Sequence, residues 1–105
     1  MIVINVLYRN TPTVEFNTDY YLKSHIPLAR KLLEPALKSI SVSKGISDGT
    51  ADSKAEFLVH TQLHFDSLES FHQAFNPHVD EMLWADLVNY SNEPPVLQIS
   101  EALVT

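Results

Sequence analysis

The sequence of 105 residues contains no cysteine and only two glycines. Without cysteine the chain forms no disulfide bond and offers no thiolate ligand to a metal ion. A glycine-rich phosphate loop or a dinucleotide-binding fingerprint needs several glycines at fixed spacing, so two glycines are too few for either. These absences exclude disulfide-stapled scaffolds and the common glycine-motif nucleotide-binding enzymes.

Basic residues are also scarce, because 7 Lys and Arg stand against 13 Asp and Glu and give a net charge of −6. No basic cluster is visible, so we expect no binding to nucleic acid or to acidic membranes. No apolar run approaches the roughly 20 residues of a membrane span. The first eight residues lack the basic start of a signal peptide. We therefore expect a cytoplasmic protein.

Composition indicates one ordinary globular domain. Hydrophobic residues make up 45% of the chain and charged residues 19%, which is typical of soluble domains. The length predicts a single domain over residues 1–105. A chain this short buries only a modest core, so association with a second copy would stabilise it.

Six segments carry the periodicity of regular secondary structure. Four predicted strands cover residues 2–8, 37–45, 56–65 and 96–102, and two helical regions cover residues 19–33 and 68–87. Asn76-Pro77 resembles a new helix start, so the second region is either one broken helix or two. The order β-α-β-β-α-β predicts an α+β, ferredoxin-like domain with a four-stranded antiparallel sheet.

The first predicted strand is apolar on both faces. Ile2, Ile4 and Val6 point one way, whereas Val3 and Leu7 point the other way. A strand with one face in water should alternate between apolar and polar residues. We therefore expect a second copy of the chain to cover the face that the helices leave bare, with two-fold symmetry.

A histidine lies on the apolar side of the first helical region. One stripe follows the helical spacing of about 100° per residue and contains Leu22, Ile26, Ala29 and Leu33. His25 falls inside the arc of this stripe once Tyr21 widens it, so it points at the core or at a cavity in the core. Two interpretations stay open, a hydrogen-bonded core histidine and an acid–base group.

Pro27 lies two residues after this histidine. Proline has no N–H, and its ring clashes with the carbonyl four residues earlier, here that of Lys23. The helix is therefore expected to kink or restart near residues 24–26. The alternative is a helix that begins late and carries Pro27 in its first turn, where proline is tolerated.

The third predicted strand supplies two further histidines. His60 and His64 are about 13 Å apart in an extended chain, too far to share a metal ion with ligand bonds of about 2 Å. We therefore expect no metal site, but their strand face is a candidate pocket wall. Further candidate walls are aromatic, namely Phe57, Phe65, Phe71 and Trp84. Three serines of residues 37–45 face either solvent or a small polar cavity. The sequence assigns no function to His72 or His78.

The segment Asp19-Tyr20-Tyr21-x-x-x-His25-x-Pro27 resembles the signature of the EthD family, named for ethyl tert-butyl ether degradation. Segments along the rest of the chain are similar to the family in order and spacing. They include Val6-Leu7-Tyr8 and residues 65–71, 74–78 and 95–101. The resemblance covers essentially the whole chain.

The resemblance implies a dimeric α+β barrel, in which two ferredoxin-like units join through their sheets. It implies a cavity between each sheet and its helices. Related enzymes in that superfamily are lactone isomerases, polyketide cyclases, cofactor-free monooxygenases and haem-handling enzymes. EthD proteins belong to catabolic and secondary-metabolite pathways. His25 matches the helix histidine of the motif, and Tyr20 and Tyr21 match its tyrosines.

Two functions follow as hypotheses. The first is a cofactor-free enzyme, an isomerase, cyclase or monooxygenase-like protein, that acts on a cyclic or aromatic carbonyl metabolite. His25 would be its general acid or base, because histidine titrates near neutral pH, and Tyr21 would hydrogen-bond the substrate. Tyr20, His60 and His64 would contact the substrate together with the aromatic walls. The second is a carrier that binds a pathway intermediate without turnover.

Overall fold

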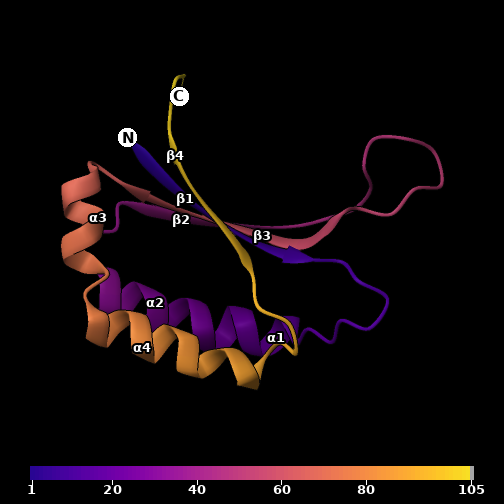
Figure 1. Cartoon of the computed structure of the whole chain (residues 1–105), viewed down its shortest axis with the longest axis horizontal. Helices are drawn as coiled ribbons and strands as arrows, with labels where there is room; N and C mark the ends of the chain where they lie inside the picture. The colour runs from indigo at the N-terminus through magenta and orange to yellow at the C-terminus, as the bar shows by residue number, and fades with distance from the viewer. Residues whose placement is uncertain (105) are drawn as a thin grey trace.

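Four strands form one antiparallel sheet in the order β2-β3-β1-β4. In this computed structural model, which describes residues 1–104, the central strands are β1 (Ile2–Arg9) and β3 (Phe57–Phe65). The edge strands are β2 (Ser39–Lys44) and β4 (Val96–Glu101). The sheet lies in one layer and the long helices in a second layer against one of its faces (Figure 1). The predicted ferredoxin-like α+β fold is confirmed.

The first helical region is a composite of three pieces. It consists of α1 (Thr18–Tyr20), a π-helical turn η1 (Tyr21–His25) and α2 (Ile26–Leu33). The Asn17 side chain caps its start by accepting a hydrogen bond from the Tyr20 N–H at 3.0 Å. The helix thus changes its winding immediately before Pro27, which lies in the first turn of α2.

The second helical region is two helices and a short 3-10 turn. These are α3 (Leu68–Ala74), α4 (Pro77–Ala85) and η2 (Asp86–Asn89). Asn76 caps α4 by accepting from the Val79 N–H at 3.0 Å, and Pro77 occupies the first turn. The chain therefore breaks where the Asn-Pro pair predicted a new start. In Figure 1, α4 runs beside α2 while α3 stands at one end of the sheet.

The core between sheet and helices contains two clusters. An aliphatic cluster is centred on Leu33, Leu63 and Phe65, and Phe65 is fully buried. A tyrosine cluster contains Tyr8, Tyr21 and Tyr90 together with Val59. Burying one large apolar side chain contributes about 1.5–3 kcal/mol to folding. We call the two groups the aliphatic cluster and the tyrosine cluster below.

The buried stripe of the first helical region differs from the predicted one. Its buried positions recur at every fourth residue, namely at Tyr21, His25, Ala29 and Leu33. Leu22, which the α-helical spacing placed in the stripe, is 48% exposed. The prediction for Leu22 was wrong because the π turn winds the chain more loosely than the α-helix that the 100° spacing assumes.

The face of the sheet turned away from the helices is polar at its centre. The Asn5 side chain bonds His60 Nε2 at 3.0 Å and the Gln62 amide at 3.3 Å. It also donates to the Ser100 hydroxyl at 3.1 Å. The three serines of β2 are exposed, so they face solvent in the single chain.

The helices are short, the longest having nine residues. Among residues 1–104, none has the length and apolar character required to cross a lipid bilayer.

Candidate active site

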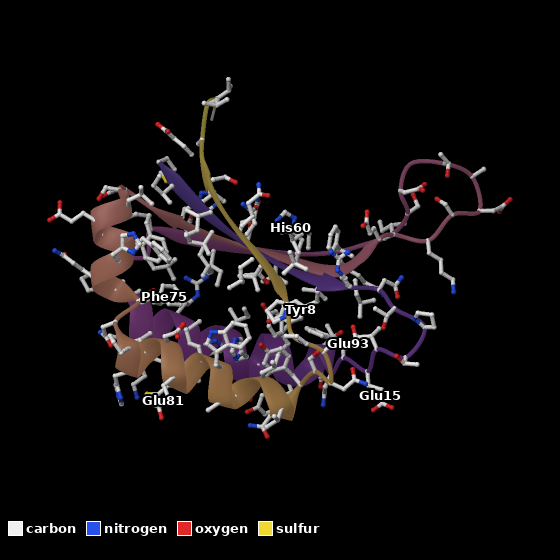
Figure 2. All side chains as sticks on the ribbon, in the orientation of Figure 1. Tyr8, Glu15, His60, Phe75, Glu81 and Glu93 are labelled. Carbon is white, nitrogen blue, oxygen red and sulfur yellow. The ribbon has the colours of Figure 1, made fainter. Side chains whose placement is uncertain are left out.

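A cavity of about 340 Å³ lies between the sheet and the helices. β1 contributes Ile4, Val6 and Tyr8 to its lining, while α4 contributes Leu83 and Trp84. Most of the lining is apolar, as is usual for pockets that take small organic molecules. Figure 2 shows Phe75 and Tyr8 towards opposite ends of the layer between sheet and helices, and both line this cavity.

One end of the cavity is polar. His25 and four hydroxyl-bearing side chains line it, those of Tyr8, Tyr21, Thr61 and Tyr90. These groups come from the first helical region, from both central strands and from the residue after η2. Only folding brings them together, because Tyr8 and Tyr90 are 82 positions apart in the chain.

The π turn aims two side chains at one carboxylate. In η1 the Ile26 N–H bonds the Tyr21 carbonyl, five residues earlier, instead of a carbonyl four residues earlier. Residues five apart point about 140° away from each other on a regular α-helix. Here Tyr20 and His25 both bind the carboxylate of Asp86. The disturbance predicted near Pro27 is therefore present as a widened turn.

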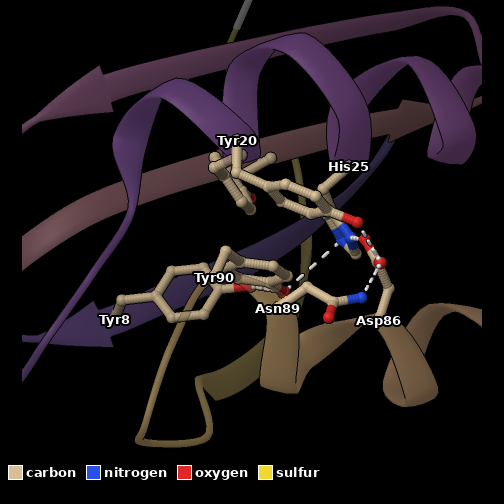
Figure 3. A network of polar contacts seen from close by, with 8 residues as sticks. Tyr8, Tyr20, His25, Asp86, Asn89 and Tyr90 are labelled. Atoms are coloured by element: carbon tan, nitrogen blue, oxygen red, sulfur yellow. Dashed lines mark hydrogen bonds and ion pairs between the residues drawn. The ribbon is translucent and has the colours of Figure 1, made fainter.

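Asp86 and His25 form a buried pair at the polar end. The distance from His25 Nδ1 to Asp86 Oδ2 is 2.8 Å, and the two side chains are only 10% and 12% exposed. Asp86 Oδ1 accepts from the Tyr20 hydroxyl at 2.6 Å and from Asn89 Nδ2 at 2.9 Å. Figure 3 shows these donors converging on the carboxylate.

The surroundings of the pair set its protonation. Burial alone would raise the pKa of Asp86, but hydrogen bonds from Tyr20, Asn89 and His25 outweigh it and hold that pKa below its usual range. Burial lowers the pKa of His25, and Asp86 opposes this shift without cancelling it. Near neutral pH the pair is therefore an ionised carboxylate and a neutral imidazole. The carboxylate accepts from Nδ1–H, which leaves Nε2 as a hydrogen-bond acceptor.

Tyrosine hydroxyls lie on the Nε2 side of His25. The Tyr90 hydroxyl is 3.5 Å from Nε2, and the Tyr8 hydroxyl is 2.7 Å from that of Tyr90 (Figure 3). Burial raises the pKa of both phenols, so both stay protonated near neutral pH. A neutral base thus faces hydroxyl groups that can donate hydrogen bonds to an oxygen atom in the cavity.

Tyr21 flanks the same imidazole. Its ring stacks on that of His25, with centroids 5.3 Å apart and planes 16° from parallel. Its hydroxyl lies 2.6 Å from the Thr61 hydroxyl on β3. Burial raises the pKa of Tyr21, so this group is a hydrogen-bond donor rather than a base near neutral pH.

The structure gathers some of the residues that the sequence singled out. His25, Tyr21, Phe71 and Trp84 all line the cavity. Tyr20 lies behind them, where it contacts Asp86 without lining the cavity.

Four other predicted residues lie elsewhere in the single chain. Phe65 is buried in the aliphatic cluster, and Phe57 lies under the guanidinium of Arg9, 5.4 Å from the ring centroid. His60 and His64 are on the opposite face of the sheet, because side chains alternate along β3 and Thr61 and Leu63 take the inner side. Their predicted place in the cavity wall is therefore corrected.

Sequence reasoning missed Asp86, Asn89 and Tyr90. All three follow the last turn of α4, and polar residues are common at the end of any helix, so they gave no signal of a site. Asp86 is 61 residues from His25, so no local spacing signals their contact. Alternation along β1 puts Tyr8 on the same face as Ile4 and Val6, and this shared face is the signal in the sequence for its place in the cavity.

Within residues 1–104, His, Asp and Glu side chains form no group of three or more that is placed to hold a metal ion.

Comparison with known proteins identifies structural relatives. An EthD-like protein from Ralstonia eutropha JMP134 matches with 31% identity and a TM-score of 0.91, over 98% of this chain and 92% of that chain. An ethyl tert-butyl ether degradation (EthD) family protein from Bacillus halodurans C-125 shares 21% identity with a TM-score of 0.75, over 98% and 99% of the two chains.

More distant structures share the fold. HapK from Hahella chejuensis is 10% identical, with a TM-score of 0.62 over 100% of this chain and 95% of that chain. No profile of a protein family matches the sequence, and no curated protein does. The similarity to the Ralstonia protein, which spans nearly the whole of both chains, decides the assignment. This chain belongs to the EthD family.

Proposed function

We propose that this protein is a cofactor-free enzyme in which His25 moves a proton on a cyclic or aromatic carbonyl metabolite. The observation that carries the proposal is the position of the His25 imidazole at the polar end of an apolar cavity, where its Nδ1 lies 2.8 Å from Asp86 Oδ2. A general base needs an unprotonated nitrogen near its operating pH, and Nε2 meets that requirement. The pathway would be catabolic or part of secondary metabolism.

The proposed proton transfer uses groups of this chain alone. Nε2 takes a proton from the carbon next to the substrate carbonyl. The electron pair of the broken C–H bond forms a C=C bond, and the π pair of the carbonyl moves onto its oxygen. Tyr21 or Tyr90 donates a hydrogen bond to that oxyanion, since both are protonated. Asp86 stabilises the imidazolium, which then returns the proton to a different atom. The net reaction is an isomerisation. It is a cyclisation where the enolate carbon first adds to a second carbonyl of the same molecule, whose oxygen then takes the proton from the imidazolium.

The His25→Gln variant tests this role. Glutamine keeps a polar side chain but holds no titratable proton, so turnover should fall by about 10²–10⁴-fold, the usual contribution of general acid–base catalysis. The ionisation of His25 should also disappear from the pH–rate profile. Unchanged turnover, measured on a sample with a folded circular dichroism spectrum, would remove His25 from the mechanism.

One observation favours the carrier alternative. Among residues 1–104, each buried side-chain nitrogen or oxygen that is shielded from solvent already has a hydrogen-bond partner. The buried polar groups at this end of the cavity therefore have hydrogen-bond partners without a substrate. Such a pocket can enclose a ligand without reacting with it. Ligand affinity that survives His25→Gln, with no turnover by the unaltered protein, would select the carrier.

A homodimer that joins two sheets into an α+β barrel is also part of the proposal. A dimeric ferredoxin-like protein from Bacteroides fragilis NCTC 9343 is similar to this chain, with a TM-score of 0.51 at 13% identity over 96% of this chain and 94% of that chain. Leu7, which is half-buried in the single chain, offers an apolar contact on the outer face of β1. Light scattering in solution should give twice the chain mass of 11.9 kDa. A stable monomer at micromolar concentration would contradict the dimer.

A further inference from the structure

The charges around the cavity are all of one sign. None of the seven Lys and Arg residues of the chain lines it. Four of the seven pair with carboxylates elsewhere on the molecule, namely Arg9, Lys23, Arg30 and Lys38. Asp80, a solvent-exposed residue, is part of the cavity lining, and the carboxylate of Asp86 lies behind His25. An anionic ligand would therefore meet two negative groups and no fixed cation.

The two ends of the cavity differ in character. Ile4 and Tyr8 both line it and are about 13 Å apart along β1, which is long enough for an extended ring compound. The Tyr8 end holds His25 and the hydroxyl groups. The other end lies beside α3. β3 ends at Phe65 and leads into α3, and the ring of Phe65 is 5.6 Å from that of Phe71 on this helix. His72 of α3 lines this second end.

We infer that the cavity selects uncharged, elongated ring compounds, whose oxygen end binds at His25 and whose far end passes Asp80, and that it rejects carboxylates. This inference rests on the proposed function only for the direction in which the ligand lies. The rejection has a general cause, since an anion moved from water into an apolar pocket without a cationic partner loses its hydration uncompensated.

Asp80 is the specificity-determining residue in this scheme. It lies on α4 six residues before Asp86, which is about 9 Å along a helix axis, and so faces a part of the ligand remote from His25. Its neighbour Glu81 carries the same charge but does not line the cavity. Figure 2 shows Glu81 at the side of α4 away from the sheet. Substituting Asp80 and Glu81 in turn therefore distinguishes an effect of charge at the cavity from an effect of the net charge of the protein.

A matched pair of probes tests the inference. 4′-Hydroxybiphenyl-4-carboxamide and 4′-hydroxybiphenyl-4-carboxylate have nearly the same shape and differ in the charge at the end opposite the hydroxyl. Titration calorimetry at pH 8, where ordinary histidines are neutral, gives both dissociation constants. We expect the amide to bind at least about tenfold more tightly than the carboxylate. Equal or tighter binding of the carboxylate would overturn the inference, as would no detectable binding of either probe.

Substitutions at Asp80 and Glu81 test whether Asp80 causes the preference for the amide over the carboxylate. Asp80→Asn should reduce the preference for the amide by about threefold, as suits the loss of one partly solvated charge, and Asp80→Lys should reduce it further. Glu81→Gln should leave the preference unchanged, and a change as large as that of Asp80→Asn would refute the role of Asp80. In His25→Gln the preference should persist, so a loss of turnover there and a loss of selectivity here are separate outcomes.

Discussion

The aliphatic cluster and the tyrosine cluster occupy the same layer between sheet and helices, but they differ in the polar groups that they bury. The aliphatic cluster buries Leu33, Leu63 and Phe65, which hold no polar atom to satisfy. The tyrosine cluster places Tyr8 and Tyr90 beside the hydrogen-bonded pair of Asp86 and His25, and each polar group there needs a partner with correct geometry. One end of this small core is thus packed by apolar side chains alone, and the other end contains buried polar groups that are hydrogen-bonded to one another.

The largest effect is expected in the aliphatic cluster. Phe65→Ala removes a fully buried ring and leaves a cavity, so the free energy of unfolding should fall by about 3–5 kcal/mol. Urea denaturation measures this change. Phe57→Ala is the matched control, because Phe57 only lies under Arg9 and should lose about 0.5–1 kcal/mol. Similar losses at both positions would show that the aliphatic cluster is not the main source of stability.

A smaller loss of stability with a larger loss of function is expected in the tyrosine cluster. Asp86→Asn keeps the shape but removes the charge that holds His25, so unfolding free energy should fall by about 1–3 kcal/mol. The pKa of His25 should drop further, because Asp86 raises it in the folded protein. Turnover should fall about 10²-fold or more.

The readouts for Asp86→Asn are urea denaturation, NMR titration of the imidazole and turnover of the same sample. Asp19→Asn is the control, since Asp19 is exposed and pairs only with Lys23. An imidazole titration that does not move in Asp86→Asn would contradict the electrostatic coupling of the pair.

Acid should destabilise the tyrosine end first. The pKa of folded His25 is below its ordinary value, so the unfolded chain binds more protons as the pH falls below about 6.5. Stability from the neutral, buried imidazole is complete above that pH and is lost as the pH falls through the lowered pKa. The slope should be at most about 1.4 kcal/mol per pH unit for one proton.

Urea denaturation between pH 7 and pH 5 measures this slope, and His25→Gln should flatten it. The lowered pKa of Asp86 acts in the same direction at lower pH, because its stabilisation is present above its ordinary pKa and lost below it. A stability that rises on acidification through this range would contradict the assignment of a neutral His25.

The smallest effect is expected from Tyr20→Phe. The substitution removes one donor from Asp86 and leaves the contacts of His25 and Asn89 in place. The pKa of Asp86 should rise, because the Tyr20 hydroxyl helps to lower it. NMR titration of the Asp86 carboxyl checks this shift. Tyr8→Phe is the comparison, since Tyr8 bonds Tyr90 rather than the carboxylate and should leave that titration nearly unchanged.

Much of the fold could be predicted because its signals are local. A run of β-branched residues located β1, alternation located the other strands, and the Asn76-Pro77 pair located the start of α4. Pro27 indicated a disturbance in the first helical region, but its form could not be derived. A π turn and a kink both accommodate a missing N–H, and the contacts of Tyr20 and Leu22 depend on which one forms.

The candidate site was predictable only in part, because only some of its residues lie on one local segment of the chain. The EthD-type motif contains His25, Tyr20 and Tyr21, which lie on one continuous segment. Candidate wall residues were predicted on both faces of β3, with Phe57 and Phe65 on one face and His60 and His64 on the other. Alternation gives two faces for each strand, but it does not say which one a helix will occupy.

The sequence by itself determined the order of elements, the position of the first helix and the histidine that its apolar side carries. These follow from periodicity and capping, which act over a few residues. Only the tertiary structure decided that Asp86 holds His25, that Tyr8 and Tyr90 line its free side, and that no basic residue lines the cavity. The physical reason is that hydrogen bonds and charges act between groups close in space, and here those groups lie 61 to 82 residues apart in the chain.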